Sequence, residues 1–243
     1  MRSKLISFFI ALGLTKAVYK SNHSLEISFY RVKTNKIKET FRVVHLSDTH
    51  IPYSGFKLHR LVKEIRELEP DLIVLTGDIL DRMADEKAVD RAHWFFDELD
   101  KIAQVVTVSG NHDYFKRNQL KHLLNDEELI LGNGIRVIGL NPYYNNELSI
   151  NPNELTLVLK HYPWPLKMAE DSYQFSGHVH GGQFRFKNRG FVGPDQGFFP
   201  KYTKGYYPLG KNRGMFLSAG LGASQIPLRL NNPNHVIVVD FVV

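Results

Sequence analysis

Short apolar runs rich in β-branched residues recur along the first half of the chain, and amphipathic stretches separate them. The runs at 41–46, 72–75 and 105–108 have the length and composition of strands buried on both faces. Between them, 57–69 and 85–99 carry apolar residues at helical spacing opposite a charged face, and a short helix is expected around 120–124. This βαβαβα order predicts a largely parallel sheet with right-handed crossovers.

The second half of the chain is richer in strands. Residues 129–131 and 135–140 flank Gly132-Asn133-Gly134 and predict a hairpin, and further strands are expected at 155–159, 173–176, 215–219 and 236–243. Residues 27–32 alternate loosely and predict an edge strand. No repeat and no Pro/Ser-rich linker separates the halves, so residues 21–243 are predicted to form a single domain with two sheets.

The N-terminus differs from the rest of the chain. Its apolar run, residues 5–14, is shorter than the roughly 20 residues that a spanning helix needs, and basic residues flank it. The residues that follow contain no clear small-x-small cleavage site, and Lys16 and Lys20 suit acidic headgroups. Residues 1–20 are therefore predicted to be an uncleaved membrane-associating segment. The alternative is a helix packed on the domain.

Composition and charge restrict the partners and the chemistry open to the chain. The chain has 243 residues, a net charge of +6 and a pI near 9.3, which favours phosphate esters, nucleic acid or acidic lipid as partners. A merely solubilising charge explains the same numbers. Cysteine is absent, which excludes disulfides, thiolate metal sites and a cysteine nucleophile without identifying the compartment.

Five of the predicted strands end in side chains that can bind metal ions. In order, they are Asp48 and His50, then Asp78, then Asn111 and His112, then His161, and finally His178 and His180. Ligands of open α/β sheets bind outside the carboxyl ends of the strands, so these side chains are expected to meet at one edge. Each of them alone is weak evidence, since a lone histidine near a strand end is usually structural.

The size of this set indicates two ions rather than one. It exceeds the four ligands of a single tetrahedral site, and a carboxylate at Asp78 could bridge two ions roughly 3.5–4 Å apart. Carboxylate, imidazole and amide ligands suit Mn, Fe, Zn or Mg. Such a pair activates water for attack on phosphorus, so no protein nucleophile is needed.

The motifs Asp48-x-His50, Gly77-Asp78, Gly110-Asn111-His112-Asp113 and Gly177-His178-x-His180 resemble those of calcineurin-like metallophosphoesterases. The resemblance implies a four-layer α/β/β/α double β-sandwich with a dinuclear centre. It assigns Asp48, His50, Asp78 and His180 to one ion, and Asp78, Asn111, His161 and His178 to the other. It makes His112 the group that contacts the phosphate and protonates the leaving group, with Asp113 orienting it.

The C-terminal part is similar to the bacterial membrane-tethered phosphodiesterase branch of this family. The similarity rests on Gly181-Gly182-Gln183, Gly220-Leu221-Gly222 and Pro227-Leu228-Arg229. It implies hydrolysis of a phosphodiester or pyrophosphate, on a lipid-linked or nucleotide-linked substrate, at the bacterial cell membrane, with no side of the membrane indicated. Two divalent ions are expected, with Mn favoured.

Residues 184–207 are rich in Phe, Tyr, Gly, Lys and Arg, and predict either a loop packed on the domain or a cap that meets an acyl chain or a membrane surface. Nucleic acid is not favoured as a partner because no known nucleic-acid module is present. Two alternatives remain: a nuclease using the same site, and a catalytically silent scaffold. A scaffold would not need His112, and no protein partner is indicated.

Overall fold

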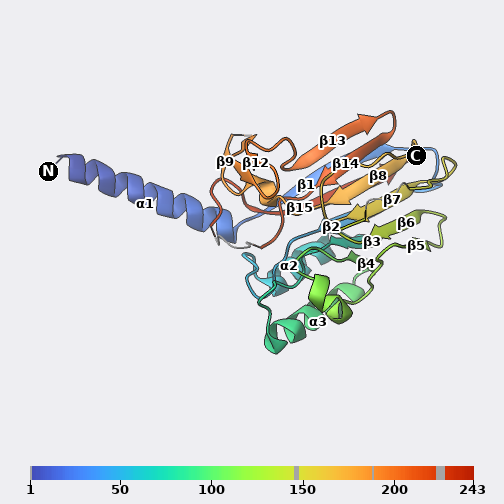
Figure 1. Cartoon of the computed structure of the whole chain (residues 1–243), viewed down its shortest axis with the longest axis horizontal. Helices are drawn as coiled ribbons and strands as arrows, with labels where there is room; N and C mark the ends of the chain where they lie inside the picture. The colour runs from blue at the N-terminus through green and yellow to red at the C-terminus, as the bar shows by residue number, and fades with distance from the viewer. Residues whose placement is uncertain (1, 145–147, 188, 223–227) are drawn as a thin grey trace.

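The computed structural model of the chain describes residues 2–144, 148–187, 189–222 and 228–243, and only the backbone of residues 2–11. Met1 and Pro227, both used in the expectations above, lie outside these residues. The described helices are α1 (Arg2–His23), α2 (Leu58–Glu67) and α3 (Glu86–Asp100), with two short 3-10 turns at Tyr114–Gln119 and His180–Gly182. Figure 1 labels the three α-helices and most of the strands.

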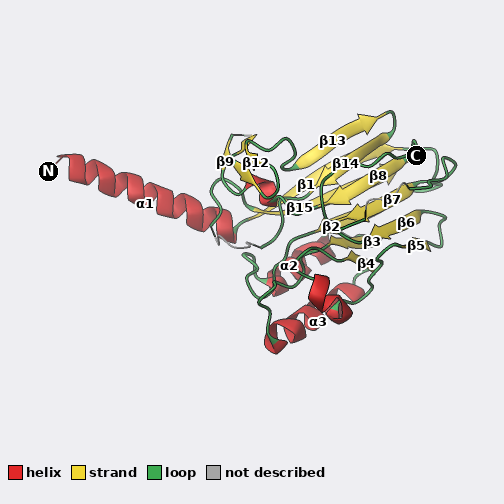
Figure 2. Ribbon diagram, viewed as in Figure 1, coloured by secondary structure: helices red, strands yellow, loops and turns green. Residues whose placement is uncertain are grey.

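Two β-sheets dominate the molecule (Figure 2). The first has the order β1-β15-β2-β3-β4, made of β1 (Leu25–Lys33), β15 (Asn234–Val242), β2 (Phe41–Leu46), β3 (Leu72–Thr76) and β4 (Gln104–Val108). Strands β2, β3 and β4 are parallel as predicted, whereas β15 enters between β1 and β2 and runs antiparallel to β2. The predicted edge strand is confirmed, because β1 lies at the edge of this sheet.

The second sheet has the order β13-β14-β8-β7-β6-β5. Its strands are β13 (Gly205–Gly210), β14 (Arg213–Leu217), β8 (Ser172–Ser176), β7 (Thr156–Lys160), β6 (Arg136–Leu140) and β5 (Glu127–Ile130). The predicted hairpin is the antiparallel pair β5–β6. Between β8 and β13, the chain forms two small hairpins: β9 (Arg185–Phe186) with β10 (Arg189–Gly190), and β11 (Val192–Gly193) with β12 (Gly197–Phe198).

Apolar side chains fill the space between the two sheets and the space under the helices. Val74, Val106, Leu157 and Phe175 belong to the cluster between the sheets, and all are almost fully buried. A second cluster joins α2 and α3 to the outer face of the first sheet, for example Leu61 and Phe96. The α/β double-sandwich fold class is confirmed. Both of these helices cover the first sheet, while a small apolar cluster around Met168 packs loop residues against the second.

The prediction of a short helix around 120–124 is wrong. A 3-10 turn precedes this position at Tyr114–Gln119, and residues 122–124 run alongside β4 instead. The N–H of Thr107 donates to the carbonyl of His122 at 2.9 Å, and the N–H of Leu124 donates to the carbonyl of Thr107 at 2.8 Å. Pairing with the edge of the sheet satisfies these backbone groups and overrides the apolar spacing.

Helix α1 projects from the body beside the small hairpins (Figure 1). Its last turn is fixed by side-chain contacts, since Asn22 Nδ2 donates to the carbonyl of Arg229 at 3.3 Å, and Asn234 Nδ2 donates to the carbonyl of Asn22 at 2.8 Å. Farther out, Leu12, Leu14 and Tyr19 are exposed. Among the described residues, α1 included, no helix combines the length and apolarity required to cross a membrane.

Candidate metal centre

The loops after five strands converge at one edge of the two sheets. Asp48 and His50 follow β2, Asp78 follows β3, Asn111 follows β4, His161 follows β7, and His178 and His180 follow β8. Except for the partly exposed Asn111, these side chains are buried. All the metal ligands that the sequence predicts therefore come together.

The loops after β3 and β4 approach each other closely at two glycines. A Cβ on Gly77 would lie 2.4 Å from the nitrogen of Gly110, and a Cβ on Gly110 would lie 2.1 Å from Oδ1 of Asp78. Neither position has space for a side chain. The contact places Asp78 directly beside the segment that carries Asn111 and His112.

Five of the predicted ligands have a left-handed backbone. The φ angles are 52° for Asp48, 45° for His50, 50° for Asp78, 75° for His178 and 46° for His180. Non-glycine residues in this region cost on the order of 1 kcal/mol each or more, and such strain concentrates at functional sites. Backbone hydrogen bonds hold the first two loops in place, from the N–H of Asp48 to Gly77 and from the N–H of His50 to Asp78, both 2.9 Å.

The ligand atoms form two clusters that share Asp78. In the first, His50 Nε2 lies 3.2 Å from His180 Nε2 and 3.6 Å from Asp78 Oδ2, and His180 Nε2 lies 3.6 Å from Asp48 Oδ1. In the second, His161 Nε2 lies 3.4 Å from the same Asp78 Oδ2, 3.3 Å from His178 Nδ1 and 3.1 Å from Asn111 Oδ1. One carboxylate oxygen thus faces both clusters.

These distances fit divalent cations. A tetrahedral ion with bonds of roughly 2.0–2.1 Å to nitrogen holds its ligands about 3.3 Å apart, close to the nitrogen–nitrogen separations found here. Ring nitrogens that face each other need a shared cation or a proton to avoid repulsion between their lone pairs. Nε2 of His180 is the ring atom that faces the other ligands, while its Nδ1 is buried and has no hydrogen-bond partner among the described residues.

The outer ring nitrogens of two ligands have well-defined acceptors. Nδ1 of His161 lies 2.7 Å from the carbonyl of Thr76, and Nε2 of His178 lies 2.8 Å from Oδ2 of Asp195. An acceptor at one nitrogen fixes the proton there and leaves the lone pair of the other nitrogen free for a metal ion. Both histidines are therefore held in the tautomer that binding requires.

The carboxylates and imidazoles of the site shift one another's pKa values toward the charged forms. Burial lowers the pKa of His161, but the carboxylates of Asp78 and Asp48 and the carbonyl of Thr76 more than offset this and raise it to about 9. Burial raises the pKa of Asp78, yet the imidazoles of His161, His50 and His112 bring it far below its ordinary value. Without a metal ion, the site therefore keeps its carboxylates ionised beside a protonated histidine.

Asp81 is a site residue that the sequence analysis missed. Its Oδ2 lies 3.2 Å from Nδ1 of His112 and 3.4 Å from Nδ1 of His50. The contact with His50 is the main reason that the pKa of Asp81 falls to about 2. Its place three residues after Asp78, in the same loop, was the available signal.

Asp113 occupies a different position from the one expected. Its carboxylate accepts hydrogen bonds from the backbone N–H groups of Ile79 (3.2 Å), Leu80 (2.8 Å) and Gly110 (3.0 Å), which ties the loop after β3 to the loop after β4. Burial and the neighbouring charge of Asp78 raise the pKa of Asp113 to about 6. The structure thus places Asp81, rather than Asp113, beside the ring nitrogen of His112.

A cavity of about 460 Å³ lies over the two clusters. Its lining includes Arg82, Asn111 and His112, together with Phe184, Val192 and Pro194 from the segment that follows β8. Tyr162 also lines it, with its ring edge-on to that of His178 at 4.4 Å between centroids. The sequence singled out neither Tyr162 nor Arg82. The cavity has room for a substituted phosphate and offers it both polar and apolar side chains.

Comparison with known proteins agrees with this geometry. A model of the family described as calcineurin-like phosphoesterase matches residues 41–182. The chain is 27% identical to the uncharacterised metallophosphoesterase YkuE of Bacillus subtilis strain 168, over 89% of this chain and 85% of that protein. It is 24% identical to an uncharacterised metallophosphoesterase of Aquifex aeolicus, over 95% and 97% of the two chains.

Two further similarities are more distant. A Danio rerio protein named a transmembrane protein with metallophosphoesterase domain is 25% identical over 80% of this chain and 52% of its own length. The structure of a dimetal phosphatase from Danio rerio aligns with a TM-score of 0.49 and 13% identity, over 76% of this chain and 88% of that one. Because the family match spans more than half of the chain, the protein belongs to the calcineurin-like phosphoesterase family and is a metal-dependent phosphoric ester hydrolase.

Proposed function

We propose that the chain hydrolyses phosphodiester or pyrophosphate bonds with two divalent ions, with Mn²⁺ as the favoured metal. The observation that carries this proposal is the shared Oδ2 of Asp78, which lies within 3.6 Å of His50 in one cluster and 3.4 Å of His161 in the other. Asp48 and His180 complete the first set, and Asn111 and His178 complete the second. When bound, the ions would neutralise phosphoryl oxygens and lower the pKa of the attacking water.

The residues around the clusters supply the remaining steps. His112 lines the cavity, and its Nδ1 lies 3.2 Å from Oδ2 of Asp81 and 3.4 Å from the backbone nitrogen of Arg82. Because Nδ1 has these two neighbours, Nε2 is the nitrogen left for proton transfer to the leaving oxygen. Burial lowers the pKa of His112, and the carboxylate of Asp81 opposes this by favouring the charged ring. Arg82 lines the same cavity with an exposed side chain, and its guanidinium can pair with an anionic group of the substrate.

We favour a diester or pyrophosphate over a monoester because the cavity offers both polar and apolar side chains to the groups that flank the phosphorus. Arg82 and His112 line the cavity together with Phe184, Val192 and Pro194. The apolar residues support a lipid-linked substrate or one with an aromatic group. A nuclease is not favoured, and a silent scaffold would not need a complete ligand set beside His112.

The test is hydrolysis of an aryl phosphodiester, an aryl phosphomonoester and a nucleotide-linked lipid in parallel, with Mn²⁺ added to metal-free protein. Faster diester or lipid turnover supports the proposal, and turnover of the monoester alone contradicts it. Single-stranded DNA tests the nuclease alternative. A nuclease should bind it with an affinity that falls steeply as the salt concentration rises.

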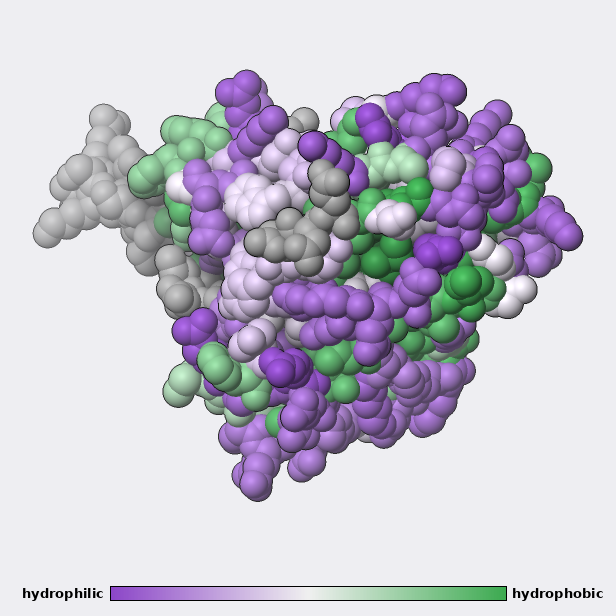
Figure 3. Space-filling model, turned by 45° about the vertical axis from the view of Figure 1, so that its right-hand side comes forward, coloured by the Kyte–Doolittle hydropathy of each residue, from purple (hydrophilic) through white to green (hydrophobic). Residues whose placement is uncertain are grey.

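We further propose that the chain associates with the bacterial cell membrane through residues 1–20 and through residues 184–207, which we name the cap. The cap contains five basic residues and one acidic residue, Asp195. Phe186, Phe198 and Phe199 in its hairpins are 75%, 71% and 68% exposed. Exposed aromatics beside basic groups suit an interface with acidic lipid. Figure 3 shows apolar and polar side chains mixed on the side from which α1 projects.

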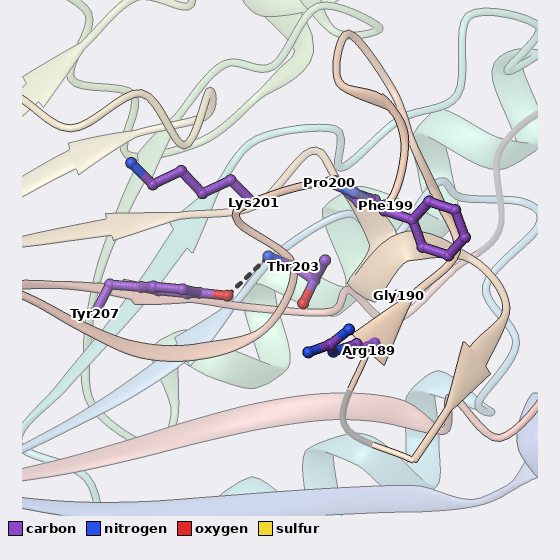
Figure 4. A pocket seen from close by; sticks show the side chains of 7 residues that line it. All are labelled: Arg189, Gly190, Phe199, Pro200, Lys201, Thr203 and Tyr207. Atoms are coloured by element: carbon purple, nitrogen blue, oxygen red, sulfur yellow. Dashed lines mark hydrogen bonds between the residues drawn. The ribbon is translucent and has the colours of Figure 1, made fainter.

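A second cavity, of about 320 Å³, lies within the cap (Figure 4). Arg189, Phe199, Lys201 and Thr203 line it, and the Phe199 ring and the Lys201 ammonium group point to opposite sides. The N–H of Thr203 donates to the hydroxyl of Tyr207 at 2.9 Å. This mixture of basic and aromatic groups supports contact with a lipid headgroup.

Vesicle binding tests the membrane proposal. Intact protein should sediment with vesicles that contain acidic phospholipid and not with neutral ones. Removal of residues 1–20 should weaken sedimentation without loss of diesterase activity, and Phe198→Ser with Phe199→Ser should weaken it further. If the intact chain stays in the supernatant with acidic vesicles at low salt, the membrane proposal is wrong and the hydrolase proposal is unaffected.

A further inference from the structure

One metal ligand is held by a side chain from outside the central sheets. His178 directs Nδ1 toward His161 Nε2 at 3.3 Å, and its opposite ring atom, Nε2, lies 2.8 Å from Oδ2 of Asp195. The corresponding outer contact of His161 is to the backbone carbonyl of Thr76, at the end of β3. His50 faces Asp81 in the loop after β3. Only for His178, among these contacts, does the acceptor come from the cap.

Asp195 lies in the turn between β11 and β12. Its side chain is 59% exposed and its φ is 57°. Other groups fix the turn: the N–H of Phe191 donates to the carbonyls of Gly182 and Phe184 at 3.1 and 2.8 Å, and Gln196 exchanges hydrogen bonds with the backbone of Tyr202. The contact of the Asp195 carboxylate with His178 is thus separate from the contacts that hold the hairpin.

From this geometry we propose that Asp195 is a positioning residue for the metal ion bound by His178, so that the cap completes one of the two metal sites. The inference rests on the proposed dinuclear centre. The carboxylate accepts a hydrogen bond from Nε2–H of His178. This keeps the lone pair of Nδ1 directed at the ion and makes the imidazole a stronger ligand. It acts through His178 and touches no reacting atom.

The position of the turn gives this contact a consequence for the substrate. Gly193, Pro194 and Asp195 line the same cavity as Asn111 and His112. A group that enters the cavity can therefore contact the turn that holds His178.

The experiment is a titration of metal-free protein with Mn²⁺, followed calorimetrically, for wild type, Asp195→Ala and Asp195→Asn. Wild type should bind two ions. Asp195→Ala should weaken one of the two steps about 10–100-fold and leave the other unchanged, because loss of an outer carboxylate typically has that effect. Asp195→Asn keeps an acceptor oxygen without the charge, so its metal affinity at this step should lie between those of wild type and Asp195→Ala.

Two control variants test whether a loss of metal affinity comes from the Asp195 carboxylate itself rather than from a disturbed hairpin or a change in surface charge. Phe198→Ser alters the same hairpin, and Asp97→Asn removes an exposed carboxylate on α3; both should bind two ions as wild type does. In a His178→Ala background, Asp195→Ala should have no further effect on metal affinity, since the two residues act as one unit.

The inference is overturned if Asp195→Ala, folded by circular dichroism, binds both ions with wild-type affinity, or if it weakens both steps equally. The same titration distinguishes this result from failure of the proposed function. If wild type itself binds no ions, the dinuclear centre is wrong, whatever the Asp195 variants do.

Discussion

The Nε2 atoms of His50 and His180 lie 3.2 Å apart, and their rings stack with centroids 5.0 Å apart at 26°. Both side chains are buried, at 0% and 4% exposure. Burial lowers the pKa of His180 to about 3, so its ring is neutral near neutral pH. The two facing nitrogens are compatible only when a proton or a metal ion lies between them.

Removal of metal ions should therefore destabilise the protein as well as inactivate it. The buried ligand clusters favour cations in the folded state, and an ion present at 100 times its dissociation constant adds about 2.7 kcal/mol of folding stability. We expect a lower melting temperature after chelation and recovery on adding Mn²⁺, measured by calorimetry. An unchanged melting temperature together with lost activity would mean that the clusters do not hold the catalytic ions in the ground state.

Asp78→Asn should remove more bound metal than any other single ligand change. The substitution keeps the side-chain volume but removes the charge that faces both clusters. Activity should fall below detection, and metal content, measured by atomic emission, should fall from two ions toward zero. Asp97→Asn, an exposed change on α3, is the matched control. Retention of both ions and of activity by Asp78→Asn would end the assignment of this residue.

Metal affinity should rise with pH. The folded, metal-free protein holds a proton on His161, whose pKa is raised to about 9 from an ordinary value of 6.5. Protonated His161 contributes to the free energy of unfolding of the metal-free protein; this contribution is fully present below pH 6.5 and is lost as the pH rises through 9. An entering ion must displace the proton, so apparent affinity for the ion at His161 should increase about tenfold per pH unit below the pKa of about 9. Calorimetry in buffers of different ionisation enthalpy should detect the released proton, and affinity that is independent of pH would contradict the assignment.

Asp81→Asn and Asp113→Asn should have different effects. Asp81 faces His112, so its loss should lower kcat about 10²-fold for a diester with a poor leaving group and much less for a nitrophenyl diester. Asp113 accepts three backbone N–H groups, so its loss should lower the free energy of unfolding by about 1–3 kcal/mol. Steady-state kinetics and urea denaturation separate these outcomes. A leaving-group-dependent loss in Asp113→Asn alone would return the orienting role to Asp113.

The central sheet and the convergence of the candidate ligands were predictable, the sheet from local patterns and the roles of the candidate ligands from the resemblance of their motifs to a known family. A run such as 72–75 is too short for a helix and too apolar for a surface, and a chemically distinctive residue, Asp78, follows it. Parallel strands bring their carboxyl ends together, so convergence of the ligands required no knowledge of distant contacts.

The features that the sequence did not reveal depend on contacts between distant segments. Asp195 reaches His178 only because the β11–β12 turn folds back over the site, and nothing in the spacing of Gly-Pro-Asp-Gln indicates that. Asp81 and Asp113 are both acidic residues near a predicted ligand, so only the geometry shows which one faces His112. The left-handed backbone at Asp48 and His180 is likewise imposed by neighbouring loops.

Arg229 should stabilise the fold around Asp48 although it binds no metal ion. It is 1% exposed, and its terminal nitrogens donate to the carbonyls of Ala219 and Gly222 at 2.7 Å each and of Pro233 at 3.1 Å. Burial lowers its pKa to about 10, so it stays charged at neutral pH. Arg229→Met keeps much of the volume but leaves buried carbonyls without donors, at about 1–3 kcal/mol for each unsatisfied group. We expect the free energy of unfolding to fall by at least about 3 kcal/mol in urea denaturation, while folded protein still binds two ions. A fall below about 1 kcal/mol would show that water replaces the guanidinium, and loss of metal with unchanged stability would place Arg229 in the metal site instead.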